Sequence, residues 1–149
     1  MSIWIDADAC PKVCRDMLCR ASERTATALI FVSNHPIPLP KSALIKAIHV
    51  PSGFDVADSK IAEEIQADEL LITQDIPLAA AAIAKGATVI TPRGDVLTKQ
   101  NIGERLTLRN FQEELRGSGM PLGGPAAIDN KDKQKFGNAL DQYLQRRKT

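Results

Sequence analysis

The sequence has no long apolar run, no marked excess of charge and few cysteines. No stretch approaches the roughly 20 apolar residues that a membrane-spanning helix needs, and no basic stretch followed by an apolar one marks a secretory signal at the N-terminus. We therefore expect a cytoplasmic protein with no membrane partner. The formal net charge of +1 argues against non-specific nucleic-acid binding, although a local basic patch could still contact a nucleic acid.

The three cysteines do not form a familiar pattern. Cys10, Cys14 and Cys19 lie within ten positions, and an odd, clustered set argues against a disulfide framework. Their spacing matches no zinc or iron–sulfur motif. We expect them to be small core residues, with Cys10 and Cys14 on one helix face. A helix start near Cys10 could lower the pKa of its thiol, although no histidine partner is evident nearby.

The composition is that of one globular domain. The chain has 149 residues, of which 44% are hydrophobic and 25% charged, values that are ordinary for a protein with a buried core. No internal repeat or second domain is visible, so we predict a single domain over residues 1–149.

Apolar patterns alternate between strand type and helix type along the chain. Strands are predicted at 3–6, 27–33, 45–50, 69–73 and 87–90, and helices at 11–24, from 55 onward, at 76–86, 99–116 and 131–146. This alternation predicts an α/β fold: three layers, with a mostly parallel central sheet flanked by helices.

Two segments are predicted to be loops. Residues 34–40 contain three prolines, which excludes a helix or a central strand. Residues 117–130 form a Gly/Pro-rich loop of unusual length for so small a domain, and loops of that length are usually functional or disordered.

Acidic residues follow the predicted strands. Because the carboxyl ends of parallel strands meet at one edge of a sheet, where ligands bind in such folds, these acids should gather there. Asp6 and Asp8 could line one cavity if the chain stays extended between them. The acids in question are Asp6, Asp8, Asp55, Asp58, Asp75 and Asp95.

Helix capping is the alternative explanation for these acids. Asp55 and Asp58 resemble a capping box, and Asp95 could be an ordinary turn residue. Capping is harder to invoke for the others, because Pro11 and Pro77 at first helical positions make Cys10 and Ile76 the caps.

Converging carboxylates need a counter-charge. Two carboxylates about 4 Å apart repel by roughly 4 kcal/mol at an effective dielectric constant of 20, and no Lys or Arg follows the first or the third strand closely. An all-oxygen cluster suits a hard divalent ion, Mg²⁺ or Mn²⁺. Carboxylates that hold such an ion can activate water and neutralise a phosphodiester in its transition state. The hypothesis is therefore metal-assisted phosphoryl chemistry at Asp6, Asp58 and Asp75.

Several motifs resemble a known family. These are IDADACP at 5–11, GFDVADSKIAE at 53–63, LLITQDIPLA at 70–79, TPRG at 91–94, GGP at 123–125 and FGNALD at 136–141. Together they resemble the bacterial YaiI/YqxD family over nearly the whole chain. That family is largely uncharacterised and is similar to PIN-like nucleases, which have a parallel sheet and an acidic cluster that binds Mg²⁺ or Mn²⁺ to cut RNA.

The resemblance implies roles for individual acids. Asp6 matches the first-strand acid, and Asp75 matches the acid after the later central strand. Asp58 stands where many such nucleases carry a Glu, one methylene longer, and Asp8 and Asp55 look like additional or supporting ligands. The implied protein is PIN-like and metal-dependent, and it cleaves RNA in preference to DNA.

Two other functions are compatible with the sequence. In a haloacid-dehalogenase-like phosphatase, Asp6 would be the nucleophile and Asp8 the acid/base, with Thr73, Lys85 and Asp95 in supporting roles. In a non-catalytic RNA-binding module, cations near the same edge would contact phosphates. The candidate substrate-binding cations are Arg93, Lys99 and Arg109, with Arg105 beside them. His35 and His49 are expected to be structural.

Overall fold

The computed structural model describes residues 2–53, 56–117 and 127–147. The strands are β1 (Ser2–Asp6), β2 (Ala28–Ser33), β3 (Ile45–His49), β4 (Leu70–Ile72), β5 (Thr88–Ile90) and β6 (Val96–Leu97). The helices are α1 (Lys12–Thr25), α2 (Val56–Glu64), α3 (Ile76–Ala84), α4 (Ile102–Gly117) and α5 (Asn130–Arg147), with a short 3-10 turn, η1, at Ala7–Ala9.

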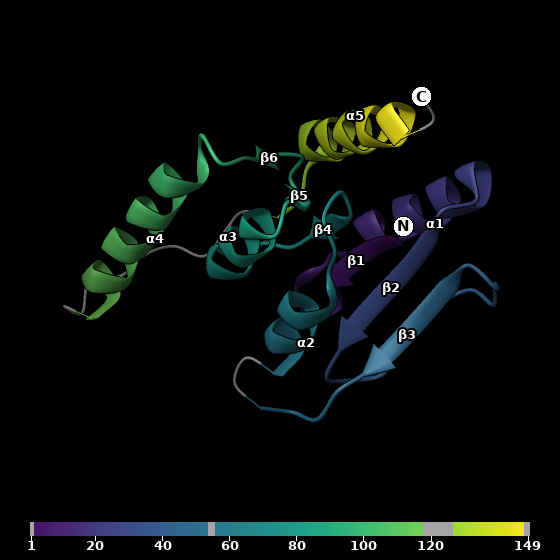
Figure 1. Ribbon diagram of the computed structural model, residues 1–149, viewed down its shortest axis with the longest axis horizontal. Coiled ribbons are helices and arrows are strands. Elements are labelled where there is room, and N and C mark those ends of the chain that lie inside the picture. Colours follow the sequence, from purple (N-terminus) through teal and green to yellow (C-terminus); the bar gives the residue numbers. More distant parts are fainter. Residues whose placement is uncertain (1, 54–55, 118–126, 148–149) are drawn as a thin grey trace.

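The strands form one mixed sheet in the order β3-β2-β1-β4-β5-β6. The first five strands of this order are parallel, and only β6 pairs antiparallel, with β5. Figure 1 shows β1, β2 and β3 running side by side with their arrowheads at one edge. The predicted α/β class with a mostly parallel sheet is confirmed.

Helices cover both faces of this sheet. On one face α1 and α5 bury a cluster that includes Leu18, Phe31 and Phe136. On the other, α2 and α3 bury a cluster that includes Trp4, Ile61 and Leu71. Strands buried on both faces read as continuous apolar runs, as ALIFV in β2 and LLI in β4 do. The predicted three layers are present, and α4 lies beyond α3 (Figure 1).

Some element boundaries differ from the sequence-based prediction. Pro11 is the N-cap of α1 rather than its first residue, because its ψ of 149° is extended. The two-residue strand β6 and the turn η1 were not predicted, since neither is long enough to show a period. Of the predicted 117–130 loop, Gly117 closes α4 and Asn130 opens α5, while residues 118–126, with the GGP motif, lie outside the described residues.

No helix among the described residues is long and apolar enough to cross a membrane.

Candidate acidic site at the carboxyl edge of the sheet

The sheet topology itself marks one position along this edge. From β1 the chain proceeds through α1 to β2 on one side, and from β4 it proceeds through α3 to β5 on the other side. The strand order therefore reverses between the neighbours β1 and β4. In open α/β sheets, ligands bind in the crevice beyond the carboxyl ends of the strands at such a switch point.

Asp6 is the last residue of β1 and so lies at the carboxyl end of a strand beside the switch point. The register pairs Ile5 with Ile72, so Asp6 lies beside Thr73, whose Oγ1 donates to Asp6 Oδ2 at 2.9 Å. Asp6 is only 7% exposed. Its pKa is raised, first because burial disfavours the charged form and further because Asp75 and Asp8 are negative, although the Thr73 hydrogen bond works in the opposite direction.

Asp75 reaches the same place from β4 and also caps α3. Its backbone N–H donates to Thr73 Oγ1 at 3.0 Å, and its Oδ1 accepts from Leu78 N at 3.0 Å. The prediction that Ile76 caps this helix was wrong: α3 begins at Ile76, Asp75 is the N-cap and Pro77 is the second residue. Thr73 thus connects the two acids, accepting from one and donating to the other.

Asp8 is held away from the crevice. The chain does not stay extended beyond Asp6, because Ala7–Ala9 form the η1 turn. Asp8 Oδ2 accepts from Asn34 N at 2.9 Å, and Oδ1 lies 2.7 Å from His35 Nδ1. Asp8 therefore ties the segment after β2 to the rim of the site and acts on Asp6 only through its charge. His35 is structural in this arrangement.

Asp58 approaches from α2. It lies in the first turn of that helix and lines a cavity of about 280 Å³ together with Asp75 and Arg109. Asp58 therefore lies at the start of α2 and borders the cavity that Asp75 also lines. Asp55 lies outside the described residues.

The predicted phosphate-binding cations separate into different environments. Arg93 Nη1 lies 2.7 Å from Asp132 Oδ2 on α5, in a partly buried ion pair. Lys99 is exposed in the turn before α4. It lines neither the cavity at Asp58 nor a second cavity of about 350 Å³, which lies between Asp75 and α4. Arg109 lines both of these cavities beside Asp75. Of the three, only Arg109 is placed next to the acidic cluster.

Sequence reasoning missed other members of the second cavity. Gln74 and Arg116 line it together with Arg105, and Gln74 Nε2 also donates to Ala9 O at 3.1 Å. Arg116 could have been found from its spacing. Arg105, Arg109 and Arg116 are four and seven residues apart, and such spacing places them on one helix face.

A divalent cation such as Mg²⁺ needs oxygen ligands that lie close together. No group of three or more His, Cys, Asp or Glu side chains in the described ranges is compact enough to hold a metal ion. Asp6 and Asp75 are linked through Thr73 and their charges interact, and Asp75 shares a cavity with Asp58. Mg²⁺ is usually bound by one or two carboxylates and otherwise by water and substrate phosphates. The residues present therefore fit a site that a substrate phosphate completes.

The cysteines and the phosphatase residues lie elsewhere. Cys10 precedes α1, so it does not share a helix face with Cys14, and burial raises the pKa of its thiol instead of lowering it. Burial likewise raises the pKa of Cys14 to about 11. Lys85 Nζ donates to the carbonyls of Ala62 and Glu63 at the end of α2, and Asp95 pairs with Lys135 and Arg105. Neither residue is available for the phosphatase roles.

Comparison with known proteins bears on the whole chain. Residues 4–146 match the family described as "Uncharacterized BCR, YaiI/YqxD family". The chain belongs to the YaiI/YqxD family. The matched range includes both acids of the site, Asp6 and Asp75.

Relatives within the YaiI/YqxD family align from end to end. A UPF0178 protein of Psychromonas ingrahamii is 53% identical over 99% of this chain and 98% of its own length. UPF0178 proteins of Thioalkalivibrio sulfidiphilus and Chromobacterium violaceum are 50% and 51% identical, each over 99% of this chain and all of their own. No solved structure matches the chain.

Proposed function

We propose that this YaiI/YqxD protein is a nuclease that depends on Mg²⁺ or Mn²⁺ and hydrolyses phosphodiester bonds, with RNA preferred over DNA. The observation that carries the proposal is the pair of acids joined through Thr73 at the switch point of the sheet. Asp6 is buried there without a cationic hydrogen-bond partner among the described residues. Burying a carboxylate in this way is unfavourable unless a cation compensates for it.

Each acid has a distinct task in the proposed reaction. Asp6 and Asp75 would hold the ion, and Asp58 would complete the acidic wall of the cavity. The bound ion would supply an activated water and neutralise charge on the phosphodiester. Thr73 keeps the Asp6 carboxylate oriented, and the cap on Leu78 N keeps Asp75 in place. Both carboxylates are thereby fixed before substrate binds.

The test is cleavage of labelled single-stranded RNA and DNA with Mg²⁺ or Mn²⁺. We expect cleavage of RNA, and a loss of more than about 100-fold in rate for Asp6→Asn and for Asp75→Asn, since a metal ligand matters more than its supporting shell. Asp16→Asn, an exposed acid on α1, is the matched control and should cleave like the unmodified protein. Titration calorimetry should show Mg²⁺ binding that Asp6→Asn abolishes.

Three results would count against the nuclease. Cleavage that persists in both variants would show that Asp6 and Asp75 are not required for the reaction. Absence of Mg²⁺ and Mn²⁺ binding would contradict the proposed metal dependence. RNA binding without cleavage by the unmodified protein, retained in an Asp6→Asn/Asp75→Asn variant, would support the non-catalytic binding module instead.

A further inference from the structure

A groove runs from the acidic site along the space between α3 and α4. Two cavities form it, of about 350 Å³ and about 280 Å³, and both are lined by Asp75 and Arg109. The smaller cavity reaches Asp58 on α2, and the larger one continues to Arg116 near the end of α4. The groove thus connects the acids of the site to a helix that contributes no buried residue to the core.

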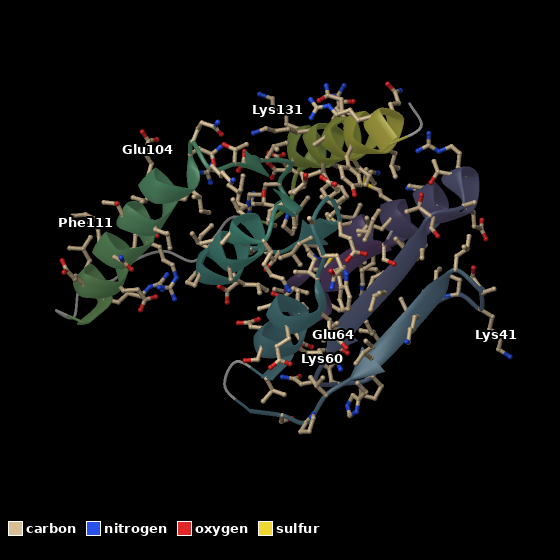
Figure 2. The ribbon with its side chains drawn as sticks, in the orientation of Figure 1. Lys41, Lys60, Glu64, Glu104, Phe111 and Lys131 are labelled. Atoms are coloured by element: carbon tan, nitrogen blue, oxygen red, sulfur yellow. The ribbon has the colours of Figure 1, made fainter. Side chains whose placement is uncertain are left out.

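One face of α4 supplies the cations of this groove. Arg105, Arg109, Gln112 and Arg116 are spaced by four, three and four residues, which places them on one helix face. All four line the larger cavity. Glu104 and Phe111 point away from α3 on the outer side of the helix (Figure 2), and Phe111 is 56% exposed. The arginine face therefore borders the groove, with Arg109 half-buried in it and Arg116 at its exposed end.

The three arginines differ in how far their charges are already paired. Arg105 Nη2 lies 3.5 Å from Asp95 Oδ2. Arg116 pairs with Glu113 at 3.4 Å in an exposed contact, and such a pair on one helix is weak. Arg109 is half-buried and makes no hydrogen bond or ion pair with any described residue. Its guanidinium presents five N–H donors to the groove.

We propose that this groove binds the backbone of a single RNA strand, with Arg109 donating to the phosphate next to the one held at Asp75. Arg116 would contact a further phosphate by exchanging its weak pair with Glu113. A guanidinium matches the geometry of a phosphate through two parallel N–H···O bonds. The inference rests on the proposed function, since it places the scissile phosphate at the acids.

The position of the arginines favours a single strand over a duplex. Helices that read a duplex project outward into its major groove, whereas here the central cation, Arg109, is half-buried in a groove beside α3. Seven residues along a helix advance by about 10.5 Å, so Arg109 and Arg116 can contact separate phosphates of one extended strand. The groove itself carries no aromatic side chain in its described lining, so recognition should depend on the backbone and tolerate different sequences.

Binding can be measured without turnover. Fluorescence anisotropy of a labelled oligouridylate of roughly twelve nucleotides, in Ca²⁺ and over a series of salt concentrations, gives Kd and its salt slope. We expect Arg109→Ala to weaken binding by about 10-fold and to reduce the slope of log K against log salt by about 0.7, the value for one lost phosphate contact on a single strand. Arg109→Ala/Arg116→Ala should reduce it by about 1.4.

Two further variants control this measurement. Arg20→Ala/Lys133→Ala removes the same charge from exposed positions on α1 and α5 and should leave the slope unchanged. Arg109→Lys keeps the charge but loses the guanidinium that can donate two parallel N–H···O bonds, so this variant should bind with intermediate affinity. Thermal unfolding of each variant shows that it is folded.

The outcomes separate this inference from the proposed function. An unchanged Kd and slope in Arg109→Ala and in the double variant would overturn the groove, even if the unmodified protein cleaves RNA. Binding that depends on Arg109 without any cleavage would overturn the nuclease and leave the groove standing. If the unmodified protein binds no single strand, the groove proposal is wrong and a protein partner becomes the next candidate.

Discussion

Two buried carboxylates of the sheet show how a single residue is assigned to structure or to chemistry. Glu69, at the opposite edge, accepts from Ser2 N, Trp4 Nε1 and Gln66 N. Three donors satisfy its charge, so its role is to join β1 to β4. Asp6 has one hydroxyl donor, and the neighbouring acids oppose its charge. A buried acid that is under-compensated in this way indicates a functional site.

Asp75 combines both roles, and two substitutions separate them. We expect Asp75→Asn to keep the cap on Leu78 N, because Asn is as good an N-cap as Asp, while losing the charge and with it RNA cleavage. Asp75→Ala should lose cleavage and also about 1 kcal/mol of unfolding free energy. Urea denaturation followed by Trp4, the one tryptophan of the chain, measures stability. Full activity in Asp75→Asn would mean that Asp75 is only a cap.

At the scale of elements, the 91–95 turn joins the sheet to α5. Gly94 has a φ of +89°, and a Cβ there would lie 2.5 Å from the backbone of Lys135 and Phe136. Arg93 and Asp95 on either side bond to Asp132 and Lys135 of the same helix. The TPRG motif is therefore a docking turn for α5, which explains why Arg93 is not at the acidic groove.

This packing predicts a large effect for one methyl group. Gly94→Ala should lower the unfolding free energy by about 2–4 kcal/mol, because the positive φ is strained for alanine and α5 must move to admit the Cβ. Gly103→Ala, where a Cβ meets nothing within 4 Å, is the matched control and should be neutral or stabilising by up to about 1 kcal/mol. Urea denaturation compares the two, and equal midpoints would show that the turn does not dock as described.

At the scale of the whole molecule, the acidic site opposes stability. The pKa of Asp6 is raised by burial and by Asp75 and Asp8, so ionised Asp6 is less favourable in the folded protein than in the unfolded chain. This cost is fully present above the raised folded pKa. It disappears as the pH falls through that pKa toward the ordinary value of 3.8.

Removing the charge of Asp6 should therefore stabilise the protein. At neutral pH we expect Asp6→Asn to raise the unfolding free energy by about 0.5–2 kcal/mol, a gain typical of sites where function opposes stability. The advantage should shrink as the pH falls toward 3.8, where Asp6 of the unmodified protein is protonated. Saturating Mg²⁺ should also shrink it, by stabilising the unmodified protein alone. Thermal unfolding across pH tests this, and a destabilised Asp6→Asn at neutral pH would contradict it.

The sequence was informative wherever a local pattern decides the structure. Continuous apolar residues, as in ALIFV, indicate a buried strand. The α/β class and the positions of Asp6 and Asp75 after strands could therefore be predicted. The N-cap of α3 could not be predicted. A proline is accepted at either of the first two helical positions, so Pro77 alone does not distinguish Asp75 from Ile76 as the cap. The strand β6 has only two residues and shows no period.

The amino-acid sequence by itself determined the alternation of the first five strands with the helices, the acids that follow those strands and the family to which the chain belongs. Those properties depend on neighbours a few residues apart. Only the tertiary structure decided that β1 lies beside β4, that Thr73 joins Asp6 to Asp75, and that Arg109 rather than Arg93 or Lys99 faces the acids. Contacts such as Asp6–Thr73 span 67 residues. They arise because burying both faces of the sheet brings distant segments together, which no short stretch of sequence specifies.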